Sequence, residues 1–176
     1  MALSMYEISV PVFKKYLGNL DAVLRKGSAF ADEKKIEHSV LLNTRLYPNM
    51  LPLLRQVQIA SDAAKGCSAR LAGLEVPKFE DTEATFDELH ARIAKTIAFL
   101  DTIKPEQVAG SESKAIHITA GKRELDFTGQ TYLSYFALPN LYFHVTTAYD
   151  ILRNNGVEIG KLDYLGHIAP LIRRGG

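Results

Sequence analysis

The sequence has little of several features that mark particular classes of protein. It contains a single cysteine, Cys67, and no tryptophan, so an intrachain disulfide framework is excluded. No apolar run approaches the roughly 20 residues that cross a bilayer, and no basic segment precedes an apolar one at the N-terminus. We therefore expect neither a membrane-spanning segment nor a signal peptide, and we predict a cytoplasmic location.

An excess of charge of one sign is also missing. Lys and Arg number 21 against 20 Asp and Glu, which gives a net charge of +1. Because nucleic acids are bound through concentrated basic surfaces, nucleic acid is not an expected partner. A chain of 176 residues with 47% hydrophobic residues is expected to form one domain, residues 1–176, around a substantial core.

Apolar residues recur three and four residues apart in four long segments, which is typical of amphipathic helices. The expected helices cover approximately residues 4–26, 48–72, 82–103 and 139–155. The first helix begins at Ser4 or at Ser9 and is expected to end at Gly27. Residues 31–47 should then form a connector, with a short helix near residues 33–38.

Alternating apolar residues replace the helical period over residues 114–128, which indicates a β-hairpin. Asp81 or Thr82 is the expected N-cap of the long helix before this hairpin, the one near residues 82–103. A short helical piece should follow the hairpin at 131–137, and the tail, 157–176, should pack irregularly across the end of the bundle. The predicted fold is mainly all-α, a four-helix bundle with one short β-hairpin before the last long helix.

A histidine interrupts the apolar stripe of the last long helix. His144 lies between Leu141 and Val145 on that face, and Asn140 falls near the same face one turn earlier. A histidine that faces a bundle core is either a hydrogen-bonded packing residue or part of a functional site. Cys67 lies in the stripe of the second long helix, where a buried packing thiol is expected.

Three stretches resemble a known group of proteins: LLNTRLYPNMLPLLRQVQIASDAAKG (41–66), ARLAGLEVPKFEDTEATFDEL (69–89) and LPNLYFHVTTAYDILRNNGVEIGKLDYLG (138–166). They are similar to an uncharacterised bacterial family of the DinB/YfiT-like superfamily, and the resemblance covers nearly the whole chain. It implies a four-helix bundle, often dimeric, with no assigned activity.

Better-known members of that superfamily bind a divalent metal through three histidines, one on the second helix and an H-x-x-x-H pair on the last. Some of those members are thiol-dependent transferases or isomerases. In this sequence His144 matches the first histidine of the pair, but Ala148 occupies the second position. The second long helix has no histidine, and Gln56 and Asp62 are its nearest substitutes. The three-histidine pattern is therefore absent, and a zinc or nickel ion would need His144, Asp62 and Gln56 as a non-standard ligand set.

Other polar residues have two interpretations each. Asp62 is either a site carboxylate or a surface carboxylate paired with Arg55 or Lys65. Arg45 either clamps a ligand carboxylate or phosphate or ties the connector to neighbouring groups. Tyr142 belongs to a tyrosine-rich C-terminal third that is either a ligand-contacting region, or core and dimer surface.

The tail offers one more candidate. Lys161 and Asp163 either fold over the bundle end and close a pocket near Tyr142 and Tyr149, or interact with each other or with solvent.

Two functional hypotheses remain open. In the first, a pocket between the second and fourth long helices binds an unknown small molecule, with or without catalysis. His144 would act there as a general base or single metal ligand, with Arg45, Asn140, Asp62 and Tyr142 as ligand contacts. In the second, the chain is a non-catalytic homodimeric interaction bundle. A metal-dependent enzyme resembling the thiol transferases, with a non-standard ligand set, is a further alternative.

Overall fold

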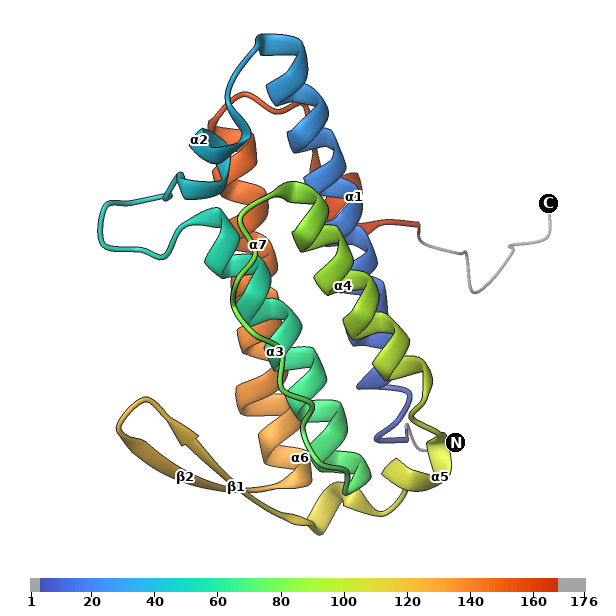
Figure 1. The fold of residues 1–176 in the computed structure, drawn as a ribbon. Coiled ribbons are helices and arrows are strands. Elements are labelled where there is room, and N and C mark those ends of the chain that lie inside the picture. Colours follow the sequence, from blue (N-terminus) through green and yellow to red (C-terminus); the bar gives the residue numbers. More distant parts are fainter. Residues whose placement is uncertain (1–3, 168–176) are drawn as a thin grey trace, which may run out of the picture.

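The computed structural model describes residues 4–167 and shows a bundle of four long helices with a hairpin at one end (Figure 1). The long helices are α1 (Val10–Lys34), α3 (Leu53–Ala72), α4 (Phe86–Asp101) and α7 (Leu138–Asn154). The shorter elements are α2 (His38–Asn43), α5 (Pro105–Val108), the 3₁₀ turn η1 (Ser111–Ser113), the strands β1 (Ala115–Ala120) and β2 (Arg123–Thr128), α6 (Gly129–Thr131), the π-helical segment η2 (Tyr132–Ala137) and α8 (Lys161–Leu165).

The four long helices surround one apolar core. α1 packs on α4 and α7, and α3 packs on the same two helices. α3 and α7 run in opposite directions along each other (Figure 1). The stripes predicted from the sequence point inward: Phe13, Leu17, Val57, Ala64 and Leu141 are all fully buried. Burying a large apolar side chain stabilises the fold by about 1.5–3 kcal/mol. The expected four-helix bundle with one hairpin before the last long helix is confirmed.

The predicted end of the first helix is wrong. α1 continues through Gly27 to Lys34, and the left-handed Lys35 (φ 56°) ends it. A Cβ at Gly27 would lie 2.9 Å from a methyl carbon of Leu152. Gly27 therefore allows α1 and α7 to approach closely, and it does not stop the helix. The helix begins at Val10, as the Ser9 alternative predicted, but the Ser9 hydroxyl donates to the Met5 carbonyl at 2.6 Å instead of capping.

Other helices also begin at residues different from those predicted. The short helix of the connector is α2, which lies later than residues 33–38. α3 begins at Leu53 instead of residue 48, because Pro52 is the N-cap residue and is extended.

The cap expected at Asp81 or Thr82 is wrong, since Thr85 caps α4. Its Oγ1 accepts from the Glu88 amide at 3.2 Å, and a Glu88 carboxylate oxygen accepts from the Thr85 amide at 2.9 Å. This reciprocal pair is a capping box.

The hairpin lies within residues 114–128, as the alternation of apolar residues predicted. β1 and β2 pair antiparallel, with Ile116 opposite Phe127, and a two-residue turn at Gly121 (φ 65°) joins them. The segment expected to be helical at 131–137 is the π-helix η2. Pro139 has no N–H to donate to the carbonyl of Tyr135, so an α-helical bond cannot form there. The Leu138 amide donates to the Leu133 carbonyl five residues back, so the chain enters α7 through a wider turn.

The chain after α7 returns across the bundle as α8. α8 packs on α1, where Lys26 lies 2.6 Å from Asp163 and the Asn19 amide donates to the Tyr164 carbonyl at 2.9 Å. The part of the predicted irregular tail after residue 167 lies outside the described residues. Within residues 4–167 no helix is both long enough and apolar enough to cross a membrane.

Candidate functional site

His144 faces inward from α7 and is 8% exposed. Its Nδ1 lies 2.7 Å from Oε1 of Gln56 on α3, and the Gln56 amide nitrogen lies 2.8 Å from the carbonyl of Leu51. A carbonyl can only accept, so the Gln56 nitrogen donates to it and Oε1 accepts from His144. This assigns the imidazole hydrogen to Nδ1. Burial lowers the pKa of His144, so the ring is neutral near pH 7.

The residues at the positions of the three-histidine pattern do not fit a bound metal. Gln56 uses its oxygen on His144 and its nitrogen on Leu51, and Ala148 has no donor atom. Within the described part of the chain, no group of three His, Cys, Asp or Glu side chains is close enough to hold a metal ion. The geometry of His144 is that of a hydrogen-bonded packing residue.

Asp62 contributes to an ionic cluster around the buried Arg92, between α3 and α4. Its Oδ1 lies 2.8 Å from Lys65 Nζ and 3.1 Å from Arg92 Nη2. Arg92, whose side chain is 1% exposed, also reaches Asp81 at 3.0 Å and Glu83 at 2.9 Å. We call Arg92 with Asp62, Asp81 and Glu83 the Arg92 cluster. The expected pairing of Asp62 with Lys65 is present, whereas Arg55 pairs with Asp81 at 2.6 Å.

Two carboxylates of the Arg92 cluster, those of Asp81 and Glu83, are held ionised. Burial alone would raise the pKa of Asp81, but hydrogen bonds from Arg55 and the charge of Arg92 lower it below its usual value. Burial opposes the ionised form of Glu83 too, and hydrogen bonds from Arg92 and Gln58 outweigh it and lower that pKa. A buried guanidinium that is paired with several carboxylates in this way is typical of a structural network.

A cleft of about 260 Å³ lies between α3, η2, the start of α7 and the end of β1. We call it the hairpin cleft. Its polar side chains are Asp62, Arg70, Thr119, Tyr132 and Asn140, and its apolar lining is Ile59, Ala63, Ile118, Ala120 and Phe136. The hairpin cleft thus lies between the second and fourth long helices, but His144, which the first hypothesis placed in such a pocket, does not line it.

Arg70 supplies the positive charge of the hairpin cleft. Nη1 donates to the Tyr132 hydroxyl at 3.2 Å, and within residues 4–167 no carboxylate pairs with this guanidinium. A Cβ at Gly66, one turn earlier on α3, would lie 2.7 Å from the same nitrogen. The absent side chain therefore leaves room for the guanidinium. Burial raises the pKa of Tyr132 to about 12, so the phenol stays neutral.

The predicted site residues do not form one site. Asp62 and Asn140 both line the hairpin cleft, where the Asn140 amide nitrogen donates to the Phe136 carbonyl at 2.7 Å. Arg45 donates to the Met50 carbonyl and remains exposed, so it ties its own loop. Tyr142 packs edge-on against Tyr16, with ring centroids 4.9 Å apart.

Arg70 and Tyr132 were missed by the sequence analysis. The two residues are 62 positions apart in the sequence, and no local pattern links them.

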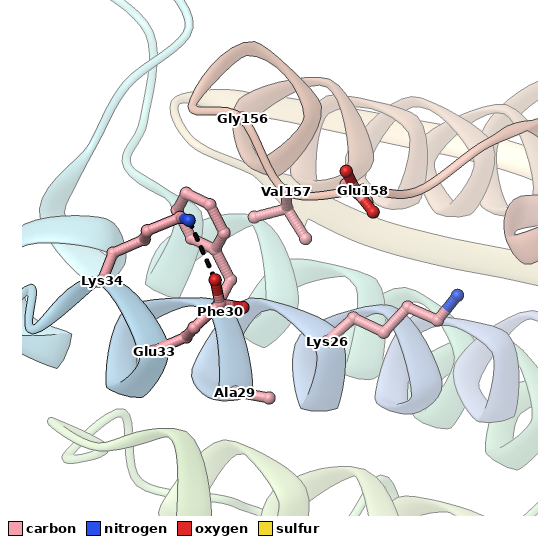
Figure 2. A pocket seen from close by; sticks show the side chains of 8 residues that line it. All are labelled: Lys26, Ala29, Phe30, Glu33, Lys34, Gly156, Val157 and Glu158. Atoms are coloured by element: carbon pink, nitrogen blue, oxygen red, sulfur yellow. Dashed lines mark hydrogen bonds and ion pairs between the residues drawn. The ribbon is translucent and has the colours of Figure 1, made fainter.

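Another groove, of about 530 Å³, lies between the end of α1 and the turn after α7 (Figure 2). Its charged groups are largely paired, since Lys34 lies 2.8 Å from Glu33 and Lys26 reaches Asp163. It is therefore a weaker candidate for a ligand site than the hairpin cleft.

Comparison with known proteins places the chain in a family. The model of the family described as "Domain of unknown function (DUF1993)" matches residues 5–165. The chain belongs to this family. A crystal structure of a DinB family member protein from Shewanella denitrificans is 44% identical to this DUF1993 protein, with a TM-score of 0.84 over 94% of this chain and 96% of that chain.

The comparisons confirm the resemblance to an uncharacterised DinB-like family that the sequence indicated. Among proteins with curated descriptions, none matches significantly.

Proposed function

We propose that this DUF1993 protein binds a small organic anion with an apolar or aromatic body in the hairpin cleft. The observation that carries the proposal is Arg70, a part-buried guanidinium beside Tyr132 that has no carboxylate partner within residues 4–167. Guanidinium groups bind carboxylates and phosphates through paired N–H donors. A cation placed in this way at the edge of a cleft is suited to an anionic ligand.

The rest of the hairpin cleft sets the character of the ligand. The rings of Tyr132 and Phe136 are stacked, with centroids 5.7 Å apart and an interplanar angle of 17°, and they form an apolar wall. The Asn140 side-chain oxygen is left as an acceptor because its nitrogen is used by Phe136. π-Helical turns such as η2 often lie at functional sites. The volume of about 260 Å³ restricts the ligand to a small molecule.

A metal has no role in the proposed binding of the anion. We propose that the three-histidine site is absent, that His144 packs against Gln56, and that the protein acts in the cytoplasm.

Benzoate tests the proposal, with uncharged benzamide as the matched probe. Titration of ¹⁵N-labelled protein followed by NMR should shift the amides of residues 59–70, 118–120 and 132–140 with benzoate, and much less with benzamide. Arg70→Gln should weaken benzoate binding by about tenfold or more, since a charge-assisted pair is lost. Arg153→Gln, on the last turn of α7, is the control and should bind as the wild type does.

Equal affinity of benzoate and benzamide would refute an anion site. So would benzoate binding that survives Arg70→Gln unchanged. If neither probe shifts the amides of the hairpin cleft, the cleft is not a site for aromatic anions.

A homodimeric interaction bundle is the second candidate. Two exposed aromatic side chains favour it: Tyr135 is 77% exposed and Phe143 is 56% exposed. Aromatic residues are enriched in protein interfaces. Sedimentation at high micromolar concentration should give twice the monomer mass, and Phe143→Ser with Tyr135→Ser should restore the monomer. A wild-type protein that stays monomeric would remove this candidate.

A further inference from the structure

A further pocket lies between α7 and α8. It has a volume of about 230 Å³ and is lined by Thr146, Tyr149 and Asp150 of α7 and by Lys161 and Tyr164 of α8. We call it the α8 pocket. It shares no residue with the hairpin cleft.

The wall formed by α8 is fixed in place. The Thr146 hydroxyl donates to the Tyr164 hydroxyl at 3.1 Å, and the rings of Tyr149 and Tyr164 meet edge to face with centroids 6.2 Å apart. On the far side of α8, Asp163 pairs with Lys26 at 2.6 Å and accepts from the Gly160 amide at 2.8 Å. These contacts hold both tyrosine rings in position before a ligand arrives.

Two opposite charges line the α8 pocket without neutralising each other. Neither Asp150 nor Lys161 makes a side-chain hydrogen bond or an ion pair with any residue between 4 and 167, and the two do not pair with each other. Burial raises the pKa of Asp150, so this carboxylate is partly desolvated. A partly desolvated charge without a counter-charge is unfavourable, and a ligand of the opposite sign would relieve that cost.

We propose that the α8 pocket binds a small zwitterion of the amino-acid type. The ammonium group lies against the Asp150 carboxylate and the rings of Tyr149 and Tyr164, since aromatic faces attract cations. The carboxylate of the ligand lies toward Lys161. The apolar part lies along the surface that the two rings present to the pocket. The anion site of the hairpin cleft is a separate proposal, and either can fail without the other.

Leucine and 4-aminobutyrate are suitable probes because they separate the two charges by different distances. Leucine methyl ester keeps only the positive charge and N-acetylleucine keeps only the negative one. Calorimetric titration should show at least one of the zwitterions binding about tenfold or more tightly than both derivatives, because each charged contact contributes separately. NMR titration should place the shifts at residues 146–150 and 161–164.

Variants of the two charged residues identify the contacts. Asp150→Asn should weaken binding of the preferred zwitterion by about tenfold, and Lys161→Met by about threefold since Lys161 is exposed. Asp87→Asn and Lys122→Met change the same charges at exposed positions away from the pocket and should leave the affinity unchanged. Circular dichroism and the thermal midpoint should confirm that each variant is folded.

Three results would overturn the proposal. The first is that neither zwitterion binds below about 10 mM, the upper end of weak specific binding. The second is that the methyl ester binds as tightly as leucine and Lys161→Met changes nothing, which would make the pocket a site for simple cations. The third is that the shifted amides lie in the hairpin cleft and persist in Asp150→Asn.

Discussion

Arg92 and Arg70 lie on neighbouring helices and have opposite surroundings. Arg92 on α4 is 1% exposed, meets three carboxylates, and donates to the Glu80 carbonyl at 3.1 Å. Arg70 on α3 makes one side-chain hydrogen bond, to the hydroxyl of Tyr132 at 3.2 Å. A guanidinium whose neighbours already supply negative charge holds the fold together. A guanidinium beside a cleft without such neighbours remains free to bind a ligand.

The partners of Arg92 explain what it stabilises. Glu80, Asp81 and Glu83 belong to the segment between α3 and α4, which has no regular secondary structure. Phe79 of the same segment lies under the ammonium groups of Lys65 and Lys95, at 4.0 and 4.1 Å from its ring centroid. The segment is therefore fixed against the bundle by charge-assisted bonds and cation–π contacts instead of backbone ladders.

The largest expected effect comes from removing the guanidinium of the Arg92 cluster. Arg92→Met leaves the partly buried Glu83 and its neighbours Asp62 and Asp81 without their shared counter-charge. Breaking a fully buried ion pair by removing one partner costs about 3–5 kcal/mol. Because Asp62 and Asp81 are 43% and 36% exposed, the free energy of unfolding in urea should fall by about 3 kcal/mol, the lower end of that range. Arg25→Met is the control, because Arg25 pairs with Asp21 at an exposed position and should cost less than about 1 kcal/mol.

A loss for Arg92→Met no larger than that for Arg25→Met would contradict the contrast between the two arginines. It would mean that the segment between α3 and α4 is held by apolar contacts alone.

An intermediate effect is expected at the pair of Gln56 and His144. Gln56→Leu leaves the His144 Nδ1 hydrogen without an acceptor in a buried place, which costs about 1–3 kcal/mol. His144→Leu leaves the Gln56 oxygen unpaired in the same way. The double variant replaces both polar groups and should cost less than the sum of the single losses, with a coupling of about 1 kcal/mol or more in urea unfolding. Strictly additive losses would show that the two residues do not act as a pair.

Much of the fold could be predicted from the sequence because helical and strand periods are local. The stripes of α3 and α7 and the alternation around Ile116 needed no knowledge of other segments. The role of Gly27 could not be predicted from the sequence, because this glycine makes room for Leu152, a residue of another helix. The N-cap of α4 could not be chosen from the sequence either, because Thr85, Asp81 and Thr82 have similar preferences for the N-cap position.

The candidate site was predicted in part for the same reason. Asn140 and Asp62 were singled out individually, and the structure places both in the hairpin cleft. The inward direction of His144 follows from its stripe, but its bond to Gln56 joins residues 88 positions apart. Arg70 could not be predicted as a site residue from the sequence. Gly66 leaves room for its guanidinium, and its hydrogen-bond partner Tyr132 lies on η2.

The smallest expected change in stability lies at Gly66 and separates folding from binding. In Gly66→Ala the new Cβ would lie 2.7 Å from Arg70 Nη1, and the flexible arginine can move away. Alanine favours a helix over glycine by about 0.5–1 kcal/mol, so the free energy of unfolding should change by no more than about 1 kcal/mol. Benzoate binding should nevertheless weaken, because the guanidinium leaves its place beside Tyr132.

Gly18→Ala is the matched control for that experiment, since a Cβ there meets nothing within 4 Å. It should bring the gain in helix stability without any change in benzoate affinity. If both variants bind benzoate as the wild type does, the place of Arg70 above Gly66 does not determine binding. The cation would then act only through its charge, and the contrast with the rigidly held Arg92 would be one of protein stability alone.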